Sequence, residues 1–297
     1  MRKYGILAIL IFLWACQSSN TGYPTLIAES PSPTLEEILL PEASGTSVIS
    51  DDDQVVLADY SNAKDGYIMV KTLTADHQPL VILIIKDEQQ YRYDLNADEQ
   101  YECFPLNMGD GTYQVKIGEK MEDNRYAVIL SWTFEAELTG DTIPYLYPNQ
   151  VVDYDQSTQA VLLSFELTKD AKTTLQRVYN IYNYVISNID YDYDKLQAAQ
   201  TDYILPILDE TLSSRKGICF DYAALMSAML RVQQIPTKVI TGYVDDGYHA
   251  WVEVYVANEG WINPELYFAE DTWNRADPTY AAANYDYQGS YTEVYEY

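Results

Sequence analysis

The sequence is poor in positive charge. It has 18 Lys and Arg residues against 45 Asp and Glu residues, which gives a net charge of −27. Proteins that wrap DNA or RNA need clustered Lys and Arg side chains to bind phosphates, and no such cluster is visible. A basic patch for an anionic lipid surface is absent as well. The composition therefore excludes nucleic-acid binding and predicts no electrostatic adhesion to lipid headgroups.

Histidine and cysteine are also scarce, with 2 His and 3 Cys among 297 residues. These numbers are too small for a Cys-rich zinc module or an iron–sulfur cluster. No Asp-x-Asp-x-Asp-Gly loop with a distal Glu is present, so a calcium-binding EF-hand loop is not expected either. We predict no cofactor. The hydrophobic fraction of 47% is that of a globular protein, and the 29 Tyr residues have no obvious cause.

The first residues resemble a targeting signal. Arg2 and Lys3 precede an apolar run over residues 6–15 that ends at Cys16. This run is too short to span a membrane stably and is typical of an export signal. Residues 13–16 resemble a bacterial lipobox, in which the cysteine becomes the first residue of the mature chain and carries the lipid. We therefore expect residues 1–15 to be a lipoprotein signal peptide and Cys16 to anchor an exported protein at the extracytoplasmic face of the cell membrane. The alternative is an ordinary signal peptide with an incidental cysteine.

The next two segments differ in composition. Residues 16–58 are rich in Pro, Ser and acidic side chains and show no sustained period, so we predict a flexible linker there. Residues 59–165 contain short β-branched and aromatic runs separated by turn signals, which predicts a β-sandwich-like domain. Within it, apolar residues alternate over 126–134 and predict one strand of a hairpin with an apolar face. Cys103 is interpreted as a small buried hydrophobic residue.

Residues 166–297 have a different pattern, and we predict an α+β domain with a Tyr-rich tail. Apolar residues recur at helical spacing over about 170–188, and a second helix is expected over about 219–234. Strands are expected over 237–244 and 248–256, and through 273–277. Helices that precede a run of strands are typical of an α+β architecture. We expect the Tyr side chains of residues 285–297 to serve in packing.

Cys219 has the setting of a reactive thiol. It follows Gly217 by two residues and begins the second predicted helix. Backbone N–H groups and the helix dipole at that position favour an anion, which lowers the pKa of a thiol. Because only the thiolate is a good nucleophile, Cys219 is a candidate catalytic residue. Its backbone N–H is a candidate half of an oxyanion hole.

His249 is the candidate base for this thiol. Alternation along its strand places Trp251 and Glu253 on the same face as His249, while the intervening Ala and Val residues belong to the core. We expect the His249 face to look toward the helix that bears Cys219. A neutral imidazole there can take the thiol proton, and a third group is needed to orient the ring. Asp277, on the strand expected over 273–277, is the candidate for that role.

Over about residues 170–285 the sequence resembles the transglutaminase-like superfamily of papain-type Cys–His–Asp enzymes. The motifs that carry the resemblance are Asn188–Asp192, Gly217–Ala223, His249–Trp251 and Asp277–Thr279, in this order along the chain. The resemblance implies a transglutaminase-like, papain-like domain after the β-sandwich-like domain. It also implies Cys219 as nucleophile, His249 as base and Asp277 as the residue that orients the base.

The third member of this triad has alternatives. Many family members place the Asp in the first Trp segment after His–Ala–Trp, but here that segment, residues 260–265, contains no Asp. Asn263 could serve instead, because an amide oxygen also accepts from an imidazole N–H. Alternatively, residues 261–272 are an inserted hairpin, and Asp277 is the true match because the Trp-to-Asp–Pro–Thr pattern recurs there. We favour Asp277; the lesser candidates are Glu265 and Asp271.

Two classes of function follow from this pattern. As an enzyme, the protein would attack amide bonds of proteins or cell-wall peptides and form a thioester, which water or an amine then releases. We favour a peptidase or amidase over a crosslinking enzyme. The alternative is a catalytically inactive binding module for a cell-surface protein or a cell-wall ligand. A disulfide between Cys103 and Cys219 would also abolish the chemistry, and His77 has no expected role.

Overall fold

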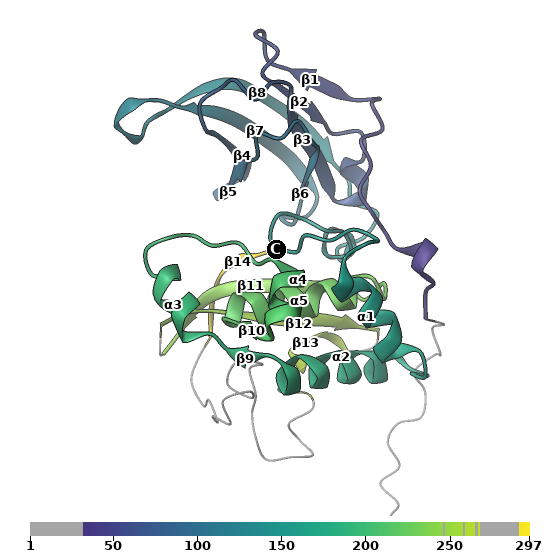
Figure 1. Cartoon of the computed structure of the whole chain (residues 1–297). Helices are drawn as coiled ribbons and strands as arrows, with labels where there is room; N and C mark the ends of the chain where they lie inside the picture. Colours follow the sequence, from purple (N-terminus) through teal and green to yellow (C-terminus); the bar gives the residue numbers. More distant parts are fainter. Residues whose placement is uncertain (1–31, 246, 258, 265–266, 268–290) are drawn as a thin grey trace, which may run out of the picture.

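The computed structural model describes residues 32–297 except residues 246, 258, 265–266 and 268–290 (Figure 1). The predicted signal peptide, Cys16 and the strand expected over 273–277 lie outside the described residues. A β-rich region occupies one end of the described part, and an α+β region occupies the other (Figure 1). None of the helices within the described ranges is long and apolar enough to cross a membrane.

The β-rich region contains two four-stranded antiparallel sheets. The first has the order β1-β2-β3-β6, and the second has the order β5-β4-β7-β8. Side chains that alternate inward on both sheets, such as Ile68, Val70, Ile82 and Ile84, belong to one hydrophobic core, as a sandwich requires. The strands are β1 (Val48–Ser50), β2 (Val56–Asp59), β3 (Tyr67–Thr72), β4 (Leu80–Lys86), β5 (Gln89–Leu95), β6 (Glu102–Pro105), β7 (Gly111–Lys120) and β8 (Tyr126–Ala136).

The β-rich region begins earlier than the linker predicted over 16–58 allows. Strand β1 and nearly all of β2 lie inside that range. The carboxylate of Asp51 accepts the N–H groups of Asp53, Val55 and Val56 at 3.1, 2.8 and 2.8 Å. The acidic run is therefore a tight turn between two strands, in which the buried Asp51 serves as the acceptor of backbone N–H groups while Asp52 and Asp53 are exposed.

The predicted hairpin is present, but its apolar face is buried only in part. Leu130 and Trp132 of β8 are buried, whereas Tyr126 and Val128 are exposed. Both exposed residues lie at the turn end of the hairpin, where Tyr126 pairs with Lys120 and Val128 with Gly118. Strand β8 is at the edge of its sheet, so this end of the strand has a neighbouring strand on one side only.

The α+β region contains both predicted helices, with α2 (Thr174–Asn188) and α5 (Cys219–Arg231) at the expected places. Strands β11 (Thr237–Val244) and β12 (Gly247–Val256) follow as expected and form the centre of a four-stranded sheet with the order β13-β12-β11-β14. The other elements are α1 (Gln159–Thr168), β9 (Asp190–Tyr191), α3 (Tyr193–Ala199), α4 (Leu208–Ser214), β10 (Lys216–Gly217), β13 (Gly260–Ile262) and β14 (Thr292–Glu296), and short 3-10 turns lie at Leu35–Glu37, Ala63–Asp65, Glu122–Asn124 and Ile143–Tyr145. The fold class is thus confirmed as α+β with a β-rich region before it.

Helix α5 lies at the centre of the α+β region and contacts α1, α2, α4, β11 and β12. Every residue from Phe220 to Arg231 is buried. Small residues, including Ala223, Ala224 and Ala228, let these neighbours approach closely on several sides. A helix that is enclosed in this way has little freedom to shift, so Cys219 at its first turn is held by a rigid element.

Arg231 at the end of α5 ties distant parts of the chain together. Its guanidinium is fully buried and donates to the main-chain oxygens of Thr237, Tyr147 and Tyr297 at 2.7–3.0 Å. Burial lowers the pKa of Arg231 to about 10, so the side chain keeps its charge at neutral pH. This one side chain connects α5, the start of β11, the segment before α1 and the residue after β14.

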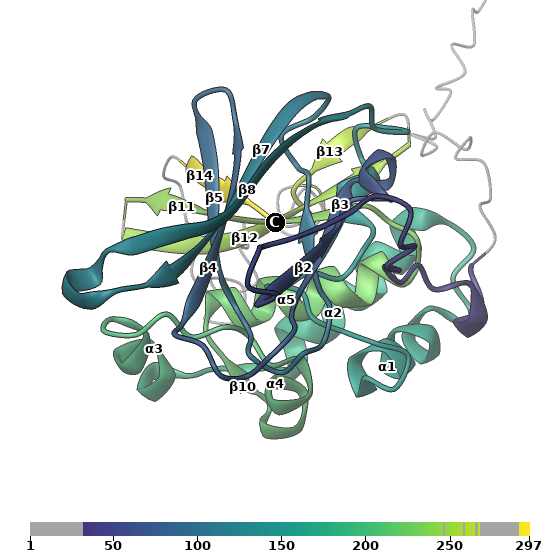
Figure 2. The same ribbon diagram turned by 90° about the horizontal axis from the view of Figure 1, so that it is seen from above.

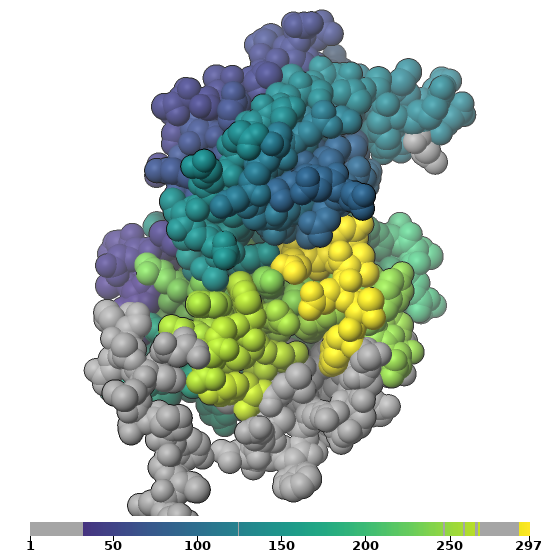
Figure 3. Space-filling model, turned by 180° about the vertical axis from the view of Figure 1, so that it is seen from behind, coloured from purple at the N-terminus to yellow at the C-terminus, as the bar shows by residue number. Residues whose placement is uncertain are grey.

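Strand β14 lies between the two regions (Figure 3). The hydroxyl of Tyr145 donates to the Glu296 carboxylate at 2.7 Å, and Lys238 of β11 forms an ion pair with it at 2.8 Å. The Lys238 ammonium also lies over the Trp261 ring at 4.5 Å. Tyr295 and Tyr297 contact the Tyr91 ring of the β-rich region. The described part of the Tyr-rich tail therefore serves in packing, as expected. Seen from above, the β-rich sheets lie over the α+β region (Figure 2).

Candidate active site

Cys219 is the first residue of α5 and is partly exposed. The first hydrogen bond of the helix runs from the Tyr222 N–H to the Ile218 oxygen at 3.1 Å. The N–H groups of Cys219, Phe220 and Asp221 precede that bond and gather at the positive end of the helix dipole. The thiol therefore has the helix-terminal position that the sequence predicts.

The turn before Cys219 is held by Asp221. Its carboxylate is 1% exposed and accepts the Ile218 N–H at 2.8 Å through Oδ2. A Cβ atom on Gly217 would lie 2.7 Å from the Asp221 Cβ, closer than real Cβ contacts allow. The Gly and the Asp of the Gly-x-Cys-x-Asp motif are therefore needed together, because the Asp folds back over the Gly.

Two motifs that are distant in sequence pair beside this turn. Strand β10 is parallel to β9, with Gly217 opposite Tyr191, and the Asp192 N–H donates to the Gly217 oxygen at 2.9 Å. The Tyr222 hydroxyl donates to the main-chain oxygen of Ile189. The Asn188–Asp192 motif is thus the strand on which the turn before Cys219 rests.

His249 lies near the start of β12 and is 6% exposed. It is opposite Gly242 of β11, and its ring is stacked on that of Trp251 with centroids 6.5 Å apart. The Trp251 ring in turn meets Tyr291 at 5.0 Å. The imidazole therefore lies beside Trp251 on its own face of the sheet.

The face of β12 that α5 covers differs from the one we expected. The Ala and Val side chains of β12 share one hydrophobic core with α5, whereas Trp251 and Ile240 are buried outside that core. The body of α5 therefore packs on the Ala/Val face and not on the His249 face. The physical reason is that α5 is buried all round and needs an apolar surface, which only the Ala/Val face supplies.

The helix that bears Cys219 and the strand that bears His249 are neighbouring elements, because α5 contacts β12. Burial raises the pKa of the Tyr248 hydroxyl, and the smallest of the contributors is Cys219. Cys219 therefore lies near the start of β12, the part of the strand that carries Tyr248 and His249.

The candidates for the third position are only partly within the described residues. Asp277, Asp271 and Glu265 lie outside them. Asn263 follows β13, which pairs with β12 through Ile262 opposite Val254. That pairing is at the end of β12 away from His249, because four or more residues of strand separate the two positions at about 3.3 Å each. Asn263 therefore follows β13 beside the half of β12 that is away from His249.

The other cysteine and the other histidine, Cys103 and His77, have contacts of a structural kind. Cys103 and Cys219 are both free thiols, so the alternative disulfide between them is not formed. Cys103 is buried against Tyr67 and Met69, and burial raises the pKa of its thiol. His77 is partly exposed, and its ring contacts the Gln78 oxygen at 2.6 Å. Within the described ranges, no group of three or more His, Cys, Asp or Glu side chains is arranged to hold a metal ion.

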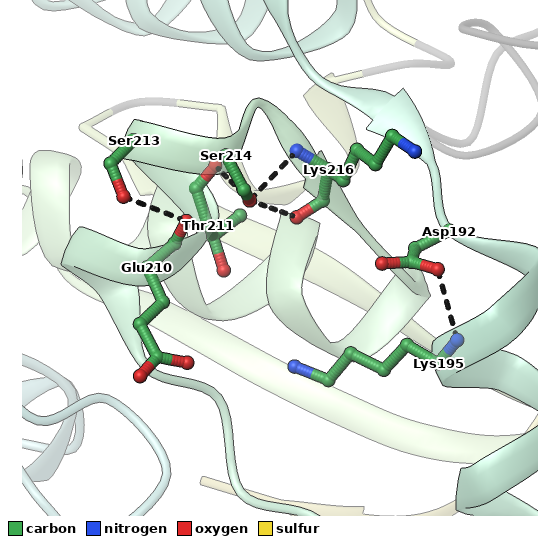
Figure 4. Close-up of a pocket in the computed structure, with 7 residues that line it drawn as sticks. All are labelled: Asp192, Lys195, Glu210, Thr211, Ser213, Ser214 and Lys216. Atoms are coloured by element: carbon green, nitrogen blue, oxygen red, sulfur yellow. Dashed lines mark hydrogen bonds between the residues drawn. The ribbon is translucent and has the colours of Figure 1, made fainter.

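A residue that sequence reasoning missed lies behind the turn. The Lys195 ammonium of α3 is 2.6 Å from Asp221 Oδ1. It also borders a polar hollow of about 310 Å³ (Figure 4), which is lined by Asp192, Lys195, Glu210, Thr211, Ser213, Ser214 and Lys216. The only local signal is the Asp-x-x-Lys spacing, since the Lys195 N–H donates to the Asp192 carboxylate at 2.9 Å.

Part of the chain is similar to known proteins. The family model of the transglutaminase-like superfamily matches residues 162–266. The UPF0252 protein MJ1282 of Methanocaldococcus jannaschii is 34% identical over 32% of this chain, and the uncharacterized protein YebA of Bacillus subtilis is 26% identical over 37% of it. These matches span 30% and 19% of the relatives' own lengths.

Two solved structures are similar to part of this chain. A suspected cysteine protease from Cytophaga hutchinsonii is similar over 66% of this chain and 73% of its own, with a TM-score of 0.37 and 22% identity. The transglutaminase of red sea bream is similar over 67% of this chain and 48% of its own, with a TM-score of 0.27 and 15% identity. The family match covers α2, β10, α5, β11, β12 and β13, which include the turn before Cys219 and the strand of His249. Residues 162–266 therefore form a transglutaminase-like domain.

Proposed function

We propose that the transglutaminase-like domain is a cysteine-dependent enzyme that acts on amide bonds. The thiolate of Cys219 attacks the carbonyl carbon, and His249 takes the thiol proton and gives it to the departing amine nitrogen. The C–N bond breaks and a thioester remains on the sulfur. Water then attacks the thioester, releases the carboxylic acid and restores the thiol. Asp277 orients the imidazole through its second nitrogen.

The observation that supports the proposal most is the position of Cys219. It is the partly exposed first residue of a fully buried helix, on a turn that Asp221 fixes. The N–H groups at that helix end favour a thiolate and a developing oxyanion.

We favour hydrolysis over amine transfer. Water is present at any exposed thioester, whereas transfer requires a second site that guides an amine. The substrate would be a protein or peptide, including a cell-wall peptide, and the net charge of −27 disfavours strongly acidic partners. Through a signal peptide over residues 1–15 and a lipid on Cys16, the enzyme would act at the extracytoplasmic face of the cell membrane.

The test is alkylation with iodoacetamide, quantified for each cysteine by peptide mass spectrometry over a range of pH. We expect Cys219 to react at neutral pH faster than a free peptide thiol, while the buried Cys103 serves as the internal control and does not react. Activity against a peptide library should be lost in Cys219→Ala. A Cys219 that reacts no faster than a peptide thiol would contradict the proposal.

A further inference from the structure

A buried carboxylate lies two residues from the proposed nucleophile. Asp221 is 1% exposed, and its two oxygens have separate partners: Oδ2 accepts the Ile218 N–H at 2.8 Å, and Oδ1 meets the Lys195 ammonium at 2.6 Å. A carboxylate near a thiol opposes the thiolate, because like charges repel. The turn before Cys219 thus uses a charge that, taken alone, works against the proposed reaction.

Lys195 is built into this turn from another element. Helix α3 is fixed at its start by Asp192, whose side chain accepts the Lys195 N–H at 2.9 Å. The Asp192 N–H in turn donates to the Gly217 oxygen at 2.9 Å. A closed chain of contacts therefore runs from Gly217 through Asp192, Lys195 and Asp221 back to Ile218, and it holds the ammonium on the side of Asp221 opposite the turn.

We propose that Lys195 is a positioning residue of the site, which neutralises Asp221 so that this carboxylate can fix the turn at Cys219 without opposing the thiolate. The inference rests on the proposed function, because it concerns the reactivity of the same thiol. A neutral capping residue would also satisfy the Ile218 N–H. The ion pair instead gives the turn a strong acceptor with no net charge, and a buried carboxylate is tolerated only when it is paired in this way.

The charged and titratable groups around Cys219 come from several elements. Asp221 lies on α5, Lys195 lies on α3, and Tyr248 and His249 lie on β12. Lys216 of β10 is close in sequence and lines the same hollow as Lys195 (Figure 4). Its side chain is exposed, and in the described part of the chain its ammonium is not paired with Asp221. Lys216 is therefore a matched control for the loss of one positive charge near the turn.

The experiment measures the rate of Cys219 alkylation against pH in the full chain, with each cysteine resolved by mass spectrometry. In Lys195→Met the bare Asp221 carboxylate should slow alkylation at pH 7 about three- to tenfold, because an unpaired negative charge disfavours the thiolate. Lys195→Arg should restore most of the rate. Lys216→Met should stay within about twofold of the wild type, because exposed charges are screened.

A double-variant cycle separates charge compensation from simple support of the turn. Asp221→Asn removes the opposing charge and should react at least as fast as the wild type, and Lys195→Met combined with Asp221→Asn should return to within about twofold of it. If Lys195→Met matches Lys216→Met, or if Asp221→Asn slows alkylation as much as Lys195→Met does, the inference is overturned. An unreactive Cys219 in the wild type would instead refute the proposed function, so the two failures differ.

Discussion

Replacing Arg231 by Met tests how the described regions are held together. The guanidinium is fully buried and makes four hydrogen bonds to the main-chain oxygens of Thr237, Tyr147 and Tyr297. The variant leaves the oxygens of Thr237 and Tyr147 without this donor, whereas Tyr297 keeps the Val239 N–H at 2.9 Å. Met has a similar length and no charge, so the change removes the hydrogen bonds while filling much of the same space.

The size of the stability loss follows from the main-chain oxygens that lose their donor. A buried carbonyl without its partner costs about 1–3 kcal/mol, and two of them are created here. Removing a buried charge returns part of that cost, because the guanidinium no longer has to be desolvated. We expect the free energy of unfolding to fall by about 2–4 kcal/mol.

Urea unfolding followed by tryptophan fluorescence at pH 7 measures this loss. Because the pKa of Arg231 is lowered only to about 10, the side chain is charged throughout pH 6–8, and the loss should be the same across that range. Arg231→Lys keeps the charge but has fewer donors, so its free energy of unfolding should lie between those of the wild type and of Arg231→Met. An Arg231→Met variant that unfolds at the same urea concentration as the wild type would refute the role of Arg231 as a tie between segments.

Two further predictions concern the turn and the sheet. In Gly217→Ala, the new Cβ would lie 2.7 Å from the Asp221 Cβ. We therefore expect the free energy of unfolding to fall by about 1–3 kcal/mol and Cys219 to be alkylated more slowly. If both values stay unchanged, Gly is not needed at this position. Burial is the main cause that raises the pKa of Glu253, with repulsion from Glu293 second, so its carboxylate destabilises the fold at pH 7. Because the pKa of Glu253 is higher in the folded than in the unfolded protein, the free energy of unfolding should increase as pH falls from 7 toward the folded-state pKa. Urea titrations should show a smaller increase in Glu253→Gln than in the wild type. An equal increase in both proteins would exclude Glu253 as its source.

Local sequence patterns were sufficient to predict the central elements of the α+β region. Helix α2 was predictable because its buried residues, such as Val178, Ile181 and Val185, recur at helical spacing. The start of α5 was predictable from the Gly-x-Cys-x-Asp motif, and β12 from its alternation. In each case the decisive interactions lie within a few residues along the chain, so a single window of sequence contains them.

Other features could not be predicted, because they depend on contacts between residues that are far apart in the sequence. Strand β1 was missed because the acidic run around Asp51 has the composition of a linker, and only the fold shows its carboxylate capturing buried N–H groups. Alternation shows which side chains of β12 share a face, but not which face a helix covers. The pairing of Lys195 with Asp221 joins residues 26 positions apart on different elements. It depends on the hydrogen bond that links Asp192, at the start of α3, to Gly217 of β10.

Strand β14 has a consequence for work with isolated fragments. A fragment cut at the limits of the family match, residues 162–266, contains α5, β11 and β12 but lacks β14. The edge of β11 from Ile240 to Tyr243 would then expose unpaired N–H and C=O groups, and Lys238 would lose its Glu296 partner. Open, apolar strand edges are templates for aggregation. We therefore expect a fragment limited to residues 162–266 to aggregate more readily than one that extends to Tyr297.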